Sequence, residues 1–116
     1  MSSRLRRNYP LLQWLSSAKP KSRASVLKSV DNDVIETICE VCLNVLKGNV
    51  PLSAAHKRRL SKHKHIYRKL VSPRVSLKQK RVLVQKGGFA PLFMGMLPMA
   101  LPIVSKLLQG VVKGVL

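Results

Sequence analysis

Acidic residues are scarce in this chain. Only 4 of its 116 residues are Asp or Glu, whereas 22 are Lys or Arg, which gives a net charge of +18. The four acids, Asp31, Asp33, Glu36 and Glu40, all lie at the spacing of one helix and have no local Ser or His partner. They are typical of helix-start charges rather than of catalytic carboxylates. The chain also lacks a phosphate-cradling glycine loop, and we expect it not to be an enzyme.

Cysteines and aromatic residues are also few. Two cysteines do not make the disulfide framework of a small secreted protein, and no secretory signal follows the basic start, because the apolar stretch after Pro10 stops at Ser16. A reducing, intracellular compartment is the expectation. Aromatic residues amount to 4% of a chain that is 46% hydrophobic, so we expect a thin core, formed by residues 9–71.

The two cysteines are spaced as a metal-binding pair would be. Cys39-x-x-Cys42, with His63 and His65, offers four zinc ligands. However, both cysteines fall inside one amphipathic helix, Cys42 lies on its apolar stripe, and His63 and His65 would point to opposite sides of a helix. The pattern favours buried thiols, and we expect neither a metal nor a cofactor.

Helical periodicity and end signals predict an all-α protein. The clearest helix is 33–47, with a regular apolar stripe, Asp31 or Asp33 as N-cap, Glu36 as a capping-box partner of Asp33, and Gly48 as the stop. Ser53 and Ser76 are the expected N-caps of two later helices. The helices expected before the Gly-Gly pair are 10–18, 21–30, 33–47, 53–71 and 77–86.

Changes in composition divide the chain into four parts. We expect a basic tail over 1–8, a small helical domain over 9–71 whose last helix is basic, a basic linker with Gly87 and Gly88 over 72–88, and an apolar, amphipathic helical tail over 89–116. The uncharged stretch 87–105 approaches the roughly 20 residues that span a bilayer, but it contains three prolines. From Ile103 onward, aliphatic residues lie opposite Lys106 and Lys113, which is typical of a helix lying in a membrane interface.

The basic segment 56–86 has twelve Lys or Arg residues and no acid. Solvated helix faces normally mix both signs, and charges of one sign repel unless an anionic polymer compensates them. Motifs that read bases are not recognisable. The segment therefore predicts sequence-independent binding of double-stranded DNA through Lys57, Arg58, Arg59, Lys62, Lys64, Arg68, Lys69, Arg74, Lys78, Lys80, Arg81 and Lys86.

The apolar tail is too hydrophobic to remain in water. A lipid membrane, a capsid protein or a second copy of the chain are the expected covers, because the thin core of the helical domain does not suffice. The expected contacts are Phe89, Leu92, Phe93, Leu97, Val104, Leu107, Leu108, Val111 and Val112.

A dense basic segment followed by Lys86-Gly-Gly-Phe-Ala-Pro-Leu-Phe-Met-Gly-Met-Leu-Pro-Met-Ala-Leu-Pro102 resembles the adenovirus core protein X family, the precursors of the mu peptide. It is also similar to small basic proteins of adenovirus-like elements such as adintoviruses and polintons. The resemblance covers about residues 56–116, in layout more than in identity. It implies a DNA-condensing protein of the virion core and host nucleus. It also implies that a maturation protease recognises the segment Gly87, Gly88 and Phe89 and cuts after Gly88. Gln85 stands where that cleavage pattern has an aliphatic residue.

Three functional hypotheses follow. The first is a non-enzymatic viral or virus-derived core or minor virion protein that condenses DNA through 56–86 and contacts capsid or membrane through its tail. The second is an intracellular, membrane-active or membrane-anchored basic protein whose basic segment holds anionic headgroups. The third is a host ribosomal or chromatin-associated protein, which leaves the tail unexplained.

Overall fold

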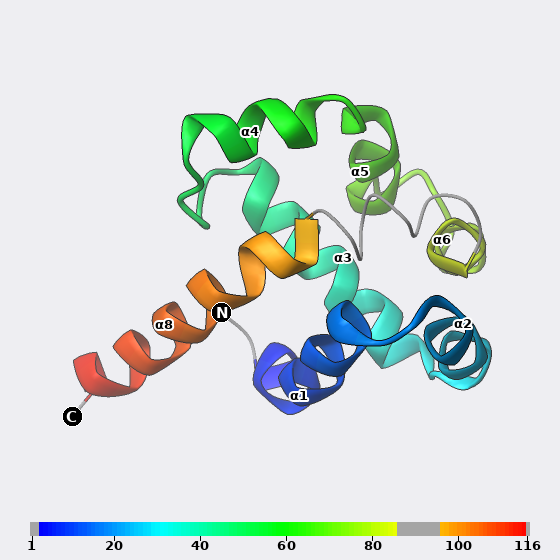
Figure 1. Cartoon of the computed structure of the whole chain (residues 1–116), viewed down its shortest axis with the longest axis horizontal. Coiled ribbons are helices and arrows are strands. Elements are labelled where there is room, and N and C mark those ends of the chain that lie inside the picture. The colour runs from blue at the N-terminus through cyan, green and yellow to red at the C-terminus, as the bar shows by residue number, and fades with distance from the viewer. Residues whose placement is uncertain (1–2, 86–95, 116) are drawn as a thin grey trace.

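The computed structural model describes residues 3–85 and 96–115, with side chains as far as Leu107. The regular secondary structure in this part of the chain is helical and includes no strand, which confirms the expected all-α class. The helices, shown in Figure 1, are α1 (Ser3–Ser17), α2 (Pro20–Ser29), α3 (Asn32–Leu46), α4 (Ala54–Ser61), α5 (Lys64–Val71), α6 (Leu77–Gln85) and α8 (Leu97–Val115).

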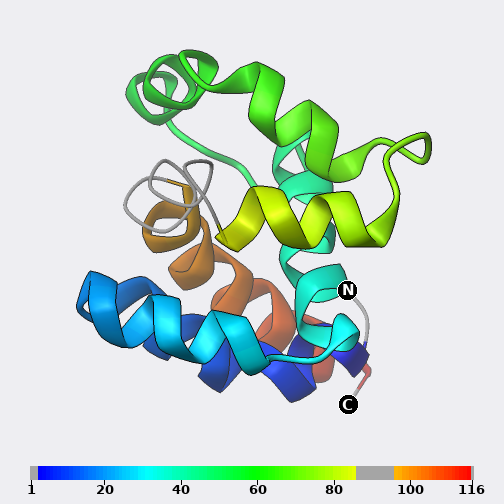
Figure 2. The same ribbon diagram turned by 90° about the vertical axis from the view of Figure 1, so that its right-hand side faces the viewer.

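Helix α3 lies at the centre of the molecule. Ile35, Ile38 and Val41 on its apolar stripe are completely buried, because α1, α5, α6 and α8 all pack against this helix. Figure 2 shows α4 and α5 at one end of the molecule and α1 and α2 at the other, with α6 between them. The long apolar face predicted for 33–47 thus organises the fold.

Both ends of α3 are fixed by local hydrogen bonds. The Asp31 carboxylate accepts from the Val34 amide at 3.1 Å, which makes Asp31 the N-cap. At the other end Gly48 has φ +79°, and the Asn49 and Gly48 amides donate to the carbonyls of Asn44 and Val45. The predicted Asp33–Glu36 capping box is wrong, because both carboxylates instead bind basic side chains of α1.

Helix α1 begins seven residues before the predicted start at Pro10. The expected basic tail over 1–8 is therefore helical from Ser3, and Leu5 is completely buried together with Leu12 and Leu15. The charges around Leu5 suggested a solvated tail. In the fold two of them face the acids of α3, which stabilises this first turn.

The helix predicted over 53–71 is two helices. Ser53 caps α4 as expected, accepting from the His56 amide at 3.2 Å. A turn at Lys62 and His63 then changes the chain direction, so that α5 packs along α3 and buries Tyr67 and Leu70. The sequence contains no Gly or Pro at this turn, so tertiary packing sets the break rather than local propensity.

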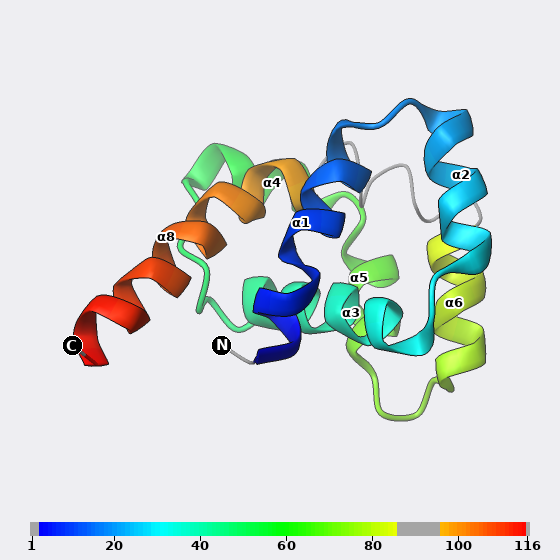
Figure 3. The same ribbon diagram turned by 90° about the horizontal axis from the view of Figure 1, so that it is seen from below.

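Helix α6 packs firmly on the helices around it, although 72–88 was expected to be a linker. Ser76 is the N-cap as predicted, and it forms a reciprocal capping box with Gln79 at the start of the helix. Val84 is completely buried, and Figure 3 shows α6 running beside α2. The Gln85 amide donates to the Leu27 carbonyl at 2.8 Å, which attaches the end of α6 to α2.

The first turns of α8 belong to the same core. Leu97, Ala100, Leu101 and Val104 are buried between α1 and α3, and the Tyr9 hydroxyl donates to the Leu101 carbonyl at 3.1 Å. Residues 96–107 were expected to lie in an apolar tail. In this structure Leu97, Ala100, Leu101 and Val104 of that stretch pack against other helices of the same chain.

Candidate nucleic-acid interface

Exposed cations follow one another along α4, α5, the turn between them and the start of α6. We call this set the basic surface and define it as the exposed Lys and Arg residues that α4, α5, their connecting turn and the start of α6 present. None of the lysines and arginines in this set is buried. The residues are Lys57, Arg58, Arg59, Lys62, Lys64, Arg68, Lys69, Arg74 and Lys78.

The acids that could neutralise this surface are engaged elsewhere. Asp33 accepts from Arg7 and Asn8, each at 2.9 Å, and from Arg4 at 3.2 Å. The hydrogen bonds from Asn8 and Arg7 lower the pKa of the Asp33 carboxyl below its usual value. Arg4 also pairs with Glu36 at 3.2 Å. All three ion pairs within residues 3–85 and 96–107 join α1 to α3, so they leave the positive field of the basic surface in place.

Three of the predicted DNA-binding residues differ from the other nine. Arg81 donates to the Val30 carbonyl and to the Asn32 side chain, both at 2.7 Å, and so connects α6 to the α2–α3 junction. Lys80 is half-buried near Cys39. Lys86 lies outside the residues that the structure describes. The predicted set thus contains one arginine whose hydrogen bonds hold the fold together.

Two histidines add to the basic surface although the sequence-based site did not include them. His63 and His65 are exposed between Lys62 and Arg68, where the chain turns from α4 into α5. An imidazole N–H donates to phosphate oxygens even when the ring is neutral. The signal was present in the sequence, since both rings lie in the acid-free run.

The two thiols lie in the core side of α3 and not at a metal centre. Burial raises the pKa of Cys39 to about 11 and that of Cys42 well above its ordinary value. Their thiols therefore stay protonated and weakly nucleophilic at neutral pH. Within the described part of the chain, His, Cys, Asp and Glu residues do not form a group of three that could hold a metal ion.

The predicted membrane or partner contacts fall into two groups. Leu97 and Val104 are completely buried and Leu107 is half-buried, so the first two do not form a contact surface in this fold. The other predicted contacts lie outside the described side chains, and they are Phe89, Leu92, Phe93, Leu108, Val111 and Val112. The predicted cleavage residues Gly87 and Gly88 also lie outside the described residues. Across the helices that the structure describes, none is long and apolar enough to span a bilayer.

The comparisons with known proteins do not add a relative. No family model, no curated protein and no solved structure matches the chain. The chemistry available therefore follows from the arrangement itself. Flexible ammonium and guanidinium groups of the basic surface can contact phosphate oxygens along a polyanion and release its condensed counterions.

Proposed function

We propose that this protein binds double-stranded DNA without sequence preference and that the basic surface makes the contacts. The observation that carries the proposal is the sorting of charge. Asp33 and Glu36 of α3 pair with α1, whereas nine Lys and Arg side chains from α4 to the start of α6 stay exposed with no acid beside them in sequence. An anionic polymer would relieve their mutual repulsion.

The side chains available favour phosphate contact over base reading. Amides that could read adenine edges are engaged within the fold, since Gln79 caps α6 and Gln85 bonds to α2. The exposed positions hold lysines and arginines on short helices. When such groups contact phosphates, they fix a protein on the duplex backbone and these contacts carry no sequence information.

The proposal extends to a non-enzymatic core or minor virion protein that condenses packaged DNA. This part depends on the resemblance of residues 56–116 to the adenovirus core protein X family. Capsid contact and protease cleavage would involve the segment around Gly87, Gly88 and Phe89. A membrane role for α8 is less favoured, because Leu97, Ala100 and Val104 would have to leave the core to reach lipid.

The first test measures the salt dependence of DNA binding. Gel-shift titrations on two unrelated duplexes should give equal affinities at each salt concentration, and log Kd should rise steeply with log salt. The variant Lys62→Gln with Lys64→Gln and Lys69→Gln should lower that slope by roughly one per lysine removed. Exposed side chains are changed, so the melting temperature should stay constant.

A matched control removes the same charge from the other end of the molecule. Lys19, Lys21 and Lys28 are exposed on or beside α2, and their replacement by Gln should change the slope much less. Equal losses for the two triple variants would mean that net charge alone drives binding. Affinity that ignores salt, or that differs between the two duplexes, would overturn the proposal.

A further inference from the structure

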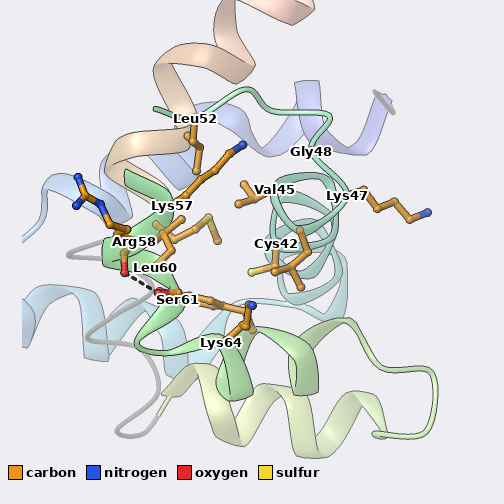
Figure 4. Close-up of a pocket in the computed structure, with 13 residues that line it drawn as sticks. Cys42, Val45, Lys47, Gly48, Leu52, Lys57, Arg58, Leu60, Ser61 and Lys64 are labelled. Atoms are coloured by element: carbon orange, nitrogen blue, oxygen red, sulfur yellow. Dashed lines mark hydrogen bonds between the residues drawn. The ribbon is translucent and has the colours of Figure 1, made fainter. Parts of the chain in front are cut away.

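A concave apolar site lies between α3 and α4, at the edge of the basic surface. It has a volume of about 500 Å³ and its apolar lining comes from α3, the loop after Gly48, α4, α5 and the residue before α8. Figure 4 shows it between the carboxyl-terminal turns of α3 and the ribbon of α4. The principal apolar side chains are Cys42, Val45, Leu52, Leu60, Tyr67 and Met96.

This groove is apolar yet open to solvent. Leu46 on its wall is 39% exposed, and Val45 and Leu52 are only half-buried. The polar groups at its floor carry no charge near neutral pH, since burial raises the pKa of Tyr67 to about 12. A ligand that covered these side chains would remove apolar surface from water.

The charged groups at the mouth are all cationic. Lys47, Lys57, Arg58 and Lys64 line the groove, and no acid does. In Figure 4 the Lys57 side chain extends from α4 toward Leu52 and α3, Lys64 lies at the opposite end beneath Cys42, and Arg58 points away. Two ammonium groups therefore flank an apolar floor.

We propose that this groove binds an anionic amphiphile with a single apolar chain. The chain would lie against Val45, Leu52 and Leu60, and the head group would contact Lys57 or Lys64. The volume lies within the roughly 300–1,000 Å³ of small-molecule sites, which combine an apolar lining with a few polar groups. The inference does not depend on DNA binding, although Lys57, Arg58 and Lys64 belong to both the groove and the basic surface.

Both parts of such a ligand are needed. A free phosphate ion would meet the lysines and leave the apolar floor uncovered, and a neutral hydrocarbon would leave the cations without a partner. A fatty carboxylate and a lysophosphatidate share the required chemistry. They differ in head group, so both are included as separate arms of the test.

The experiment titrates full-length protein with monomeric dodecanoate and with a lysophosphatidate of the same chain, followed by methyl NMR and calorimetry. We expect shifts of the Val45, Leu52, Leu60 and Met96 methyls, with Val82 and Leu83 on the far side of the basic surface unchanged. Dodecyltrimethylammonium, which has the same chain and the opposite charge, should bind about tenfold more weakly or worse. Inorganic phosphate should not change the chemical shifts of these methyl groups.

Two double variants complete the design. Lys57→Glu with Lys64→Glu should weaken dodecanoate binding about tenfold or more, whereas Lys62→Glu with Arg68→Glu, which changes the net charge equally, should have little effect. Leu46→Asp should also weaken dodecanoate binding, because it places a carboxylate on the groove wall and leaves the buried residues of α3 unchanged. Equal weakening by both double variants, equal binding of the cationic amphiphile, or shifts elsewhere in the molecule would overturn the proposal.

Discussion

Some basic side chains form hydrogen bonds within the fold and others are exposed, and the sequence does not show which are which. Arg23 is buried and donates from Nε to the Leu15 carbonyl at 2.8 Å and from Nη2 to the Ala18 carbonyl at 2.9 Å, at the end of α1. Arg81 binds the end of α2 in a similar way. A planar, forked guanidinium holds separate N–H donors in a fixed geometry toward two acceptors, whereas a lysine offers donors from a single nitrogen.

Arg81 provides a test at this scale. Arg81→Gln should lower the free energy of unfolding by about 1–3 kcal/mol, since the Val30 carbonyl and Asn32 lose a charged donor. It should change the salt slope of DNA binding little. The exposed Arg68, replaced by Gln, should do the opposite. Thermal melts and gel shifts on both variants test this prediction. An unchanged melting temperature for Arg81→Gln would mean that the Arg81 hydrogen bonds do not hold α6 in place.

Among the helices, the stripe of α3 should be the most sensitive to substitution. Ile38 is 0% exposed, and burial of such a side chain contributes about 1.5–3 kcal/mol, to which Ile38→Asp adds the larger cost of burying a charge. We expect this variant to be unfolded at room temperature by circular dichroism. Leu46→Asp, on the exposed end of the same helix, is the control and should melt near the wild type. Retained helicity in Ile38→Asp would refute the central place of α3.

Helix ends were predictable where a local hydrogen bond decides them. Asp31, Ser53 and Ser76 act as caps, and Gly48 ends α3, because each signal involves only neighbouring residues. The sequence did not reveal the turn at Lys62 and His63 or the helical start of α1. Those features depend on contacts with α3, and a pattern within one segment carries no information on its partner.

At the scale of the molecule, the same limit explains the site. The basic surface could be predicted as a run, but which of its members are exposed depends on how α6 docks. The apolar groove between α3 and α4 could not be predicted, since its walls come from segments far apart in the chain. The burial of Leu97 and Val104 likewise depends on a face that α1 supplies.

Whether the start of α8 belongs to the domain can be measured directly. Val104→Asp should destabilise the whole protein by more than about 3 kcal/mol, because Val104 is 0% exposed and packs in the shared core. Lys106 lies two residues after Val104 on the same helix and is exposed, so Lys106→Gln should leave the melting temperature unchanged. If α8 were an independent tail, both variants would melt like the wild type.

The ion pairs between α1 and α3 give the molecule an electric polarity. Opposite charges neutralise one another where α1 crosses the start of α3, and uncompensated positive charge lies at α4 and α5, so the protein carries a dipole along that direction. Near a polyanion this dipole would turn each copy the same way before contact. A film of such copies on DNA would present one repeated outer face to the surroundings, formed by α1 and α2.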